Sequence, residues 1–191
     1  MVDGGEAWLD LYWIPVGAGT RFQRASLVFY EAMAAAVSRR QRMALVHAGV
    51  KLGLDGRRYT FELMPAPAGD NPDGEVTGPV GVGPAGRLRL FRYRACLFEA
   101  AALPDEVWAI GEPVRLSKEL EVIRQVVELR REIPAYTWGR RRRGHSEMWT
   151  SDSAVAWLLG RAGIEVGAIV APPGTRAPGW RAGIEELCLR P

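Results

Sequence analysis

The alternation of hydrophobic and polar positions predicts three strands in the first third of the chain. The first covers residues 8–16, and two more cover residues 43–54 and 57–64. Asp55-Gly56 separates the second strand from the third, and this dipeptide is typical of a two-residue hairpin turn. The sequence therefore predicts an antiparallel hairpin soon after the first strand.

This turn also predicts which side chains of the hairpin share a face. Positions whose numbers sum to 111 oppose each other, so that His47 faces Met64 and Gly49 faces Glu62. His47 and Glu62 then lie on the same face as diagonal neighbours. A slip of one residue would place them on opposite faces, so their proximity depends on this register.

Apolar residues at helical spacing predict three helices further along the chain. Two cover residues 26–40 and 118–131, and Ser117 is a suitable N-cap for the second. The third begins within Thr150-Ser151-Asp152-Ser153, whose side-chain oxygens can cap free backbone amides, and it ends near Gly163.

The remaining segments complete the expected architecture. Residues 65–86 carry five prolines and six glycines, which indicates a long loop of the kind that often serves as a lid or binding loop. Residues 87–94 alternate as a strand, and residues 184–189 are expected to form a last strand. We predict one α+β domain over residues 1–191, with helices packed on an antiparallel sheet of about five or six strands.

Composition narrows the class of protein. Hydrophobic residues make up 48% of the chain and charged residues 25%, which is ordinary for a soluble globular domain. No stretch approaches the roughly 20 apolar residues that a membrane helix needs, and no signal peptide is visible. Because Cys96 and Cys188 are too few for a disulfide framework, we expect a cytoplasmic protein.

Metal and cofactor motifs are missing from the sequence. His47 and His145 are the only histidines, and no cysteines stand at ligand spacing, so we expect no metal site. The Gly-rich residues 78–83 lack the Lys-Ser/Thr ending of a phosphate-binding loop. We therefore expect no cofactor.

A run of four arginines is a second candidate site, in a chain whose net charge is only +3. Guanidinium groups bind carboxylates and phosphates bidentately, so an adaptor could dock an acidic partner at Arg140, Arg141, Arg142 and Arg143. A solvated loop is the alternative, and His145 beside it is expected to be exposed. Nucleic acid is not expected as a partner, because no aromatic platform accompanies the run.

The start of the third predicted helix is the first candidate site. Ser151 lies in the first turn, where the helix dipole and free amides stabilise a developing anion. A serine needs a general base to become a nucleophile, so His47 could take its proton and Glu62 could orient the imidazole. The alternative is that the serines only cap the helix, and that His47 is an ordinary sheet histidine.

Two short motifs, in this order, resemble those of circularly permuted papain-like domains. Val46-His47-Ala48-Gly49-Val50 resembles the His-bearing strand of permuted NlpC-type peptidases, lecithin-retinol acyltransferase-like proteins and PPPDE-type peptidases. Thr150-Ser151-Asp152-Ser153 stands where those families open the helix that bears their cysteine nucleophile. The resemblance implies a papain-like fold with His47 as the base and Ser151 in the place of the cysteine. It covers roughly residues 43–64 and 147–163.

The whole chain also resembles an uncharacterised bacterial family. It keeps that family's opening Leu9-Asp10-Leu11-Tyr12-Trp13, its Met148-Trp149 pair and its tail over residues 172–180. It departs at Thr150 and Asp152, where the family pattern has Asn. This resemblance supports the fold and implies no particular activity.

These features leave two classes of function open at the first candidate site, beside the adaptor described above for the arginine run. The first is a hydrolase or acyltransferase that acts on an amide, ester or thioester through His47 and Ser151. The second is a non-catalytic protein that has lost the nucleophilic cysteine and binds a peptide or small molecule in the same groove. In both cases we expect the groove to be lined by neighbours of Ser151, namely Trp149, Thr150, Asp152, Ser153 and Trp180.

Overall fold

The computed structural model describes residues 6–16, 43–65, 75–80, 92–99, 103 and 105–189. These residues form seven strands and three α-helices. The strands are β1 (Trp8–Pro15), β2 (Ala44–Leu54), β3 (Arg57–Pro65), β4 (Thr77–Pro79), β5 (Arg92–Glu99), β6 (Val114–Ser117) and β7 (Thr175–Arg176). The α-helices are α2 (Leu120–Leu129), α3 (Ser151–Arg161) and α4 (Trp180–Leu189), and the 3-10 helices are η3 (Glu106–Trp108), η4 (Arg130–Glu132) and η5 (Val166–Ala168).

The predicted α+β class is confirmed, and the sheet is somewhat larger than predicted. Its strands follow the order β4-β5-β3-β2-β1-β6 with antiparallel neighbours, and β7 adds a two-residue parallel pair with β2. The short strands β4 and β7 raise the number to seven. The helix expected over residues 26–40 and much of the loop expected over residues 65–86 lie outside the described residues.

The hairpin of β2 and β3 has the predicted register. Val50 opposes Phe61 and Lys51 opposes Thr60, so that opposed positions sum to 111. Both turn residues have positive φ, 52° at Asp55 and 78° at the glycine that follows, as a two-residue hairpin of this kind requires. The register places Glu62 on the same face of the hairpin as Lys51 and His47.

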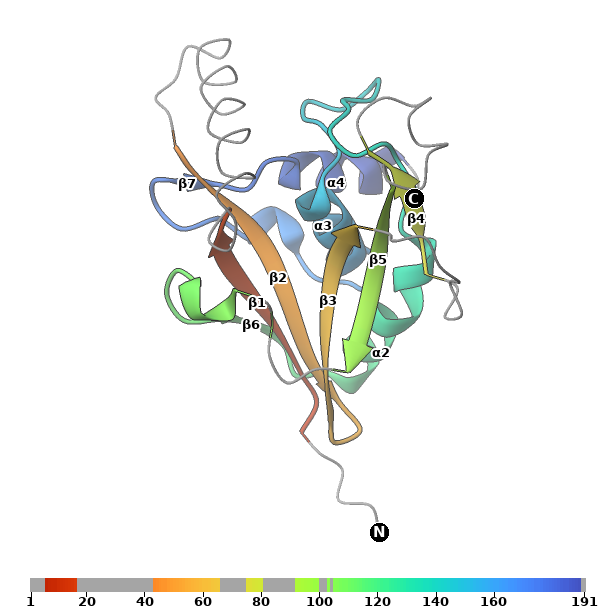
Figure 1. The fold of residues 1–191 in the computed structure, drawn as a ribbon. Coiled ribbons are helices and arrows are strands. Elements are labelled where there is room, and N and C mark those ends of the chain that lie inside the picture. The colour runs from red at the N-terminus through yellow and green to blue at the C-terminus, as the bar shows by residue number, and fades with distance from the viewer. Residues whose placement is uncertain are drawn as a thin grey trace.

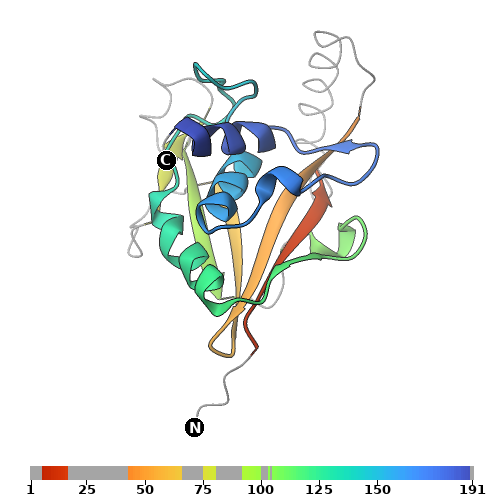
Figure 2. The same cartoon turned by 180° about the vertical axis from the view of Figure 1, so that it is seen from behind.

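The three α-helices cover one face of the sheet, as Figures 1 and 2 show from opposite sides. Alternate residues of β1 and β2 are buried in a common core with apolar residues of α3. The strand residues in this core are Leu9, Leu11, Trp13, Val46, Ala48, Val50 and Leu52. Because successive strand residues point to opposite faces, Tyr12, His47 and Lys51 belong to the other face.

The last helix, α4, stands where a strand was predicted over residues 184–189, and that prediction is wrong. This helix packs closely on α3: a Cβ added at Gly183 would lie 2.3 Å from the backbone oxygen of Ser153. The short segment was ambiguous between strand and helix, and its packing on α3 decides for a helix. The helix predicted over residues 118–131 is confirmed by α2 and η4.

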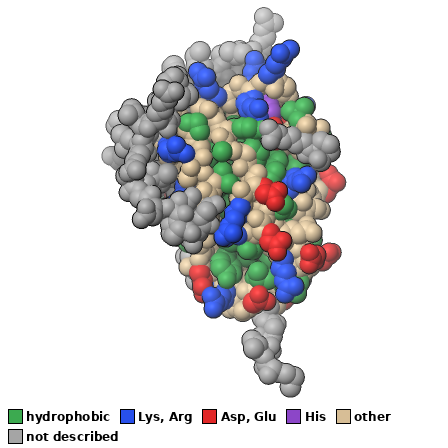
Figure 3. All heavy atoms as spheres, turned by 90° about the vertical axis from the view of Figure 1, so that its right-hand side faces the viewer, with side chains coloured by type: hydrophobic (Ala, Val, Ile, Leu, Met, Phe, Trp, Pro, Cys, Tyr) green, Lys and Arg blue, Asp and Glu red, His purple; other side chains and the backbone are tan. Residues whose placement is uncertain are grey.

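The face of the sheet opposite α2, α3 and α4 is partly covered by the segment around η3. The Leu103 side chain packs over Gly49, where an added Cβ would lie only 2.3 Å from its Cδ2. Lys51 Nζ lies 2.8 Å from a carboxylate oxygen of Glu106 in η3. Figure 3 shows an adjoining side of the molecule, where acidic and basic side chains are scattered among hydrophobic ones.

Candidate functional site

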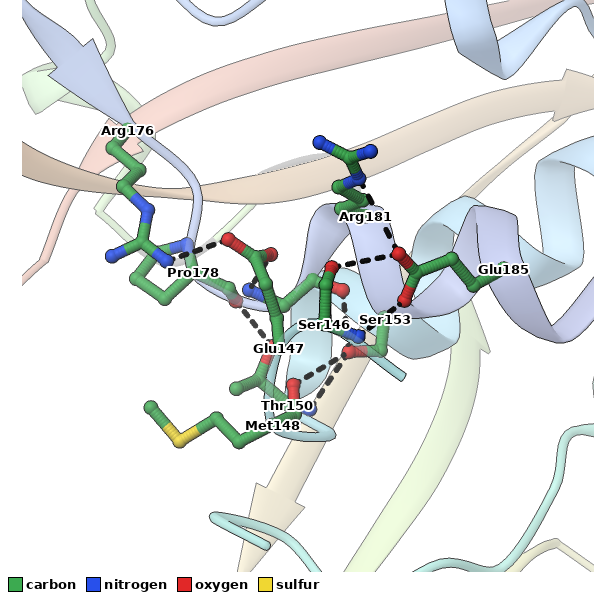
Figure 4. A network of polar contacts seen from close by, with 10 residues as sticks. Ser146, Glu147, Met148, Thr150, Ser153, Arg176, Pro178, Arg181 and Glu185 are labelled. Carbon is green, nitrogen blue, oxygen red and sulfur yellow. Dashed lines mark hydrogen bonds and ion pairs between the residues drawn. The ribbon is translucent and has the colours of Figure 1, made fainter. Parts of the chain in front are cut away.

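The N-terminus of α3 is closed by a dense set of hydrogen bonds. Thr150 is the N-cap: its hydroxyl accepts from Asp152 N at 3.2 Å and donates to Pro178 O at 2.6 Å. Ser153 Oγ accepts from Thr150 N at 2.9 Å and donates to Gly179 O at 2.7 Å. Figure 4 shows Thr150 and Ser153 turned toward the chain at Pro178. The hydroxyls predicted to line a groove therefore join α3 to the segment before α4.

Two carboxylates, those of Glu147 and Glu185, hold the segments on either side of this junction. Glu147 accepts from Arg176 at 2.6 Å and from Gly179 N at 2.9 Å. Glu185 of α4 accepts from both the backbone N and the hydroxyl of Ser146, each at 2.7 Å (Figure 4). These contacts position the segment that leads into α3 against the segment that leads into α4.

Asp152 ties α3 to the sheet. Its carboxyl group is buried and accepts a hydrogen bond from Ala48 N at 2.8 Å. Burial raises the pKa of Asp152 to about 8; the Ala48 hydrogen bond opposes this rise and the nearby Glu147 carboxylate adds to it. Around neutral pH this side chain is therefore largely uncharged, and its role here is a structural contact between α3 and β2.

Ser151 and His47 lie on elements that touch, but no hydrogen bond between these two residues occurs within the described residues. Ser151 is the half-buried first residue of α3, directly before Asp152. His47 directly precedes Ala48, the residue of β2 that Asp152 contacts. The alternation along β2 directs the His47 side chain away from the core that Val46 and Ala48 share with α3.

His47 lies instead with Glu62 and Asp105 on the other side of the sheet. Burial lowers the pKa of His47, with the Asp105 carboxylate acting against this effect. Burial, together with the same Asp105 carboxylate, raises the pKa of Glu62. Asp105 therefore acts on both side chains, which places the three acid–base groups in one neighbourhood. We call His47, Glu62 and Asp105 the sheet-face cluster.

One polar atom of the sheet-face cluster has no partner among the residues that the structure describes. Glu62 Oε2 is buried and accepts no hydrogen bond from any of them. Buried polar atoms are nearly always paired, and an unpaired one carries a desolvation cost of about 1–3 kcal/mol. No group of three His, Cys, Asp or Glu side chains within the described ranges is placed to hold a metal ion.

Lys51 and Glu106 form an ion pair next to the sheet-face cluster. The Lys51 ammonium group donates to both carboxylate oxygens of Glu106, at 2.9 and 2.8 Å. Burial, followed by the Glu106 and Asp10 carboxylates, raises the pKa of Tyr12 to about 12. Lys51 and Tyr12 thus hold η3 over β1 and β2, and Asp105, the N-cap of η3, is thereby placed near His47 and Glu62.

The two tryptophans expected to line a groove are buried in the core. The Trp149 ring packs edge-on against Tyr136 with centroids 5.0 Å apart. The Trp180 ring lies 5.3 Å from that of Trp13, and its indole N–H donates to Val166 O at 3.4 Å. With Thr150, Asp152 and Ser153 bonded as described above, all five expected lining residues have packing or bonding roles in this structure. A ligand contact by any of them stays a prediction.

The prediction that His145 is exposed is wrong. Its side chain is 2% exposed, and Nε2 lies 3.0 Å from Glu186 Oε2 of α4. Tyr136 donates to the other Glu186 oxygen at 2.5 Å, and the Arg142 guanidinium lies 3.5 Å from the centroid of the Tyr136 ring. Glu186, 41 residues further along the chain, supplies the buried partner that the local sequence does not show.

The arginine run lies beside this buried group. Arg142 lies 3.6 Å from Glu186 as an ion pair, whereas Arg140, Arg141 and Arg143 are exposed and make no ion pair within the described residues. An acidic partner at these three side chains stays a prediction, and binding that weakens steeply with added salt would support it.

Sequence reasoning missed Asp105, Glu106 and Glu186 as members of these polar groups. Asp105 and Glu106 follow a stretch without clear periodicity, so nothing local indicated that η3 folds back over the sheet. The helical spacing of Trp180, Ile184 and Leu187 was the one signal that Glu186 lies on a helix.

Two further observations concern membrane helices and similarity to known proteins. Among the described residues, no helix is both long and apolar enough to cross a bilayer. Comparison of the chain with models of known protein families, with curated proteins and with solved structures found no match to any of them.

Proposed function

We propose that the protein binds an organic ligand at the sheet-face cluster, and that this binding does not involve catalysis by Ser151. The observation that carries the proposal is the buried, unpaired Glu62 Oε2, which lies in one neighbourhood with His47 and Asp105. A ligand that donates a hydrogen bond to this oxygen would remove its desolvation cost. The hydroxyls around Ser151 support the same choice, because they are engaged in joining α3 to the rest of the chain.

The chemistry of the cluster favours a ligand with an amino group. The lowered pKa of His47 keeps its imidazole neutral at pH 7, while Glu62 and Asp105 supply carboxyl groups. A primary ammonium group brings three N–H donors and a positive charge, and it can contact both a carboxylate and an imidazole nitrogen. Amines and peptides with a free amino terminus are therefore the class of ligand that we propose.

Thermal unfolding in the presence of amines tests this proposal. The probes are butylamine, putrescine and the dipeptide Ala-Ala, each measured with the wild type and with Glu62→Gln, His47→Ala and Ser151→Ala. We expect stabilisation of the wild type and of Ser151→Ala, amounting to about 2.7 kcal/mol at a concentration of about a hundred times Kd. Glu62→Gln and His47→Ala should lose it.

A matched control separates the site from general charge effects. Glu99→Gln removes an exposed carboxylate from β5 that pairs with exposed Arg57, so it should leave the stabilisation unchanged. Stabilisation that persists in Glu62→Gln and disappears in Ser151→Ala would reject the proposed location.

Serine-dependent acyl chemistry is the second candidate, and one contact favours it. The hydrogen bond from Ala48 N to Asp152 brings the first turn of α3 against the residue next to His47. This juxtaposition also supports the resemblance to permuted papain-like domains. In this proposal β2 would shift its register by one residue, because only such a slip moves His47 to the face of the sheet on which α3 lies. Labelling of Ser151 by a fluorophosphonate probe, lost in His47→Ala, is the result that this candidate requires, and wild-type protein that stays unlabelled would reject it.

A further inference from the structure

The segment between η3 and β6 exposes an unusual number of large hydrophobic side chains. Val107 is 84% exposed and Trp108 is 58% exposed, and Ile110 and Val114 nearby are also exposed. Figures 1 and 2 show this segment in green, projecting from the side of the sheet that β6 borders. Exposed tryptophan and aliphatic side chains that gather in one place are typical of protein interaction sites.

The same segment borders an open edge of the sheet. β6 is the last strand of the order, and β1 is its one neighbour among the described strands. The edge extends toward η3, because Ile110 N donates to Trp13 O of β1. Alternate backbone N–H and C=O groups of an edge strand point outward and can pair with an added strand.

The charges on this surface are unequal. Arg115 is paired with Asp10, and Lys118 is paired with Glu6. Asp105 and Glu112 are exposed and make no ion pair within the part of the chain that the structure describes. The uncompensated charge around the apolar side chains is therefore acidic.

We propose that the β6 edge binds an extended segment of a partner protein that carries apolar and basic side chains, by adding it as a further strand. The backbone of such a segment would pair with β6, its apolar side chains would cover Val107 and Trp108, and its basic side chains would lie near Asp105 and Glu112. A second copy of this chain fits less well, since a two-fold interface would bring the same acidic side chains against each other.

Peptide binding to the full chain tests the proposal. The probes are two fluorescein-labelled octapeptides, one of alternating Val and Lys and one of alternating Val and Glu. Their binding is measured by fluorescence anisotropy. We expect the Val-Lys peptide to bind and the Val-Glu peptide not to bind. Trp108→Ala should weaken binding at least about tenfold, which is the scale of an aromatic hot spot. Glu112→Gln should weaken it several-fold and make it less sensitive to salt.

Val170→Ala is the matched control, because Val170 is an equally apolar and strongly exposed side chain outside this segment. It should bind the Val-Lys peptide like the wild type. The proposal is overturned if the Val-Lys peptide does not bind, if it binds Trp108→Ala as tightly as the control, or if the Val-Glu peptide binds equally well. Sedimentation that shows a wild-type dimer, lost in Trp108→Ala, would overturn the heterologous partner in favour of a second copy.

Discussion

Asp152 and Gly179 show how single residues build the junction between the sheet, α3 and α4. The Asp152 carboxyl group accepts a hydrogen bond from Ala48 N, in the place of a carbonyl from a neighbouring strand. A titratable group is thereby buried in the core. Gly179 has a φ of 90° and lies directly against the two hydroxyls that cap α3. Both residues contribute to stability through contacts that a single substitution can remove.

Asp152→Asn should change how the stability of the protein depends on pH. The folded state raises the pKa of Asp152 from 3.8 to about 8, so the folded protein binds one more proton than the unfolded chain between these values. The free energy of unfolding should therefore fall as pH rises through this window, by at most about 1.4 kcal/mol per pH unit. Asparagine accepts the Ala48 hydrogen bond and does not titrate. The free energy of unfolding of Asp152→Asn should therefore fall less between pH 5 and pH 8 than that of the wild type. Urea unfolding at pH 5 and pH 8 measures this, and parallel losses in both proteins would contradict it.

Gly179→Ala and Gly163→Ala should differ although both glycines have a φ of 90°. A Cβ at residue 179 would lie 2.4 Å from Thr150 Oγ1 and 2.6 Å from Ser153 Oγ, whereas at residue 163 nothing lies within 4 Å. Each substitution should cost about 1–2 kcal/mol for the backbone conformation, and Gly179→Ala about 1–3 kcal/mol more for the steric overlap. Denaturant unfolding midpoints of the two variants measure this difference. Equal losses of stability would show that the hydroxyls of Thr150 and Ser153 move aside at little cost.

At the scale of elements, the buried group around Glu186 anchors the arginine-bearing loop to α4. His145→Ala should cost about 1–3 kcal/mol, because it removes a buried side chain that contacts the Glu186 carboxyl group. The neighbouring exposed Arg143 is the control, and Arg143→Ala should change stability by less than about 0.5 kcal/mol. Chemical denaturation compares the two variants. A loss for His145→Ala no larger than that of the control would mean that Tyr136 and Arg142 suffice to hold Glu186.

Elements whose own sequence carries a clear turn or capping pattern could be predicted. Elements whose structure depends on packing against residues far along the chain could not. The Asp55-Gly56 turn sets the register of β2 and β3 through its own backbone preference, so this register was correct. The caps of α3 were likewise visible in Thr150 and Ser153. The strand predicted in place of α4 was wrong, because a six-residue segment has no decisive period until α3 supplies its packing surface.

The candidate site shows the same division. The shared face of His47 and Glu62 follows from strand alternation and a known turn. Asp105 could not be predicted, since it reaches this face through η3, which is held by the distant pair of Lys51 and Glu106. The hydrogen bond from Ala48 N to Asp152 joins residues 104 positions apart, and nothing in either local sequence specifies it.

At the scale of the whole molecule, the sheet separates two environments. One face is packed by three helices around the apolar core, and the other carries the sheet-face cluster. In our proposal the helical side stabilises the fold and the other side binds the ligand.

Amine binding should depend on pH in a direction that the cluster sets. Since the pKa of Glu62 is raised, its carboxylate forms at higher pH than that of an ordinary glutamate, and amine affinity should increase as pH rises through that range. His47 has a lowered pKa, so its imidazole becomes neutral at a lower pH than that of an ordinary histidine. Calorimetric titration at pH 5 and pH 8 measures the change, and Glu62→Gln should show weak binding at both values.

A backbone NMR titration with the most stabilising amine distinguishes the sheet-face cluster from the N-terminus of α3. If the amine binds at the cluster, we expect saturable shifts of the Glu62 amide and of its neighbours on β3 and β2, with the Ser151 amide little changed. Shifts centred on Ser151 and the first turn of α3, with Glu62 unmoved, would contradict it and assign the ligand to the helix N-terminus.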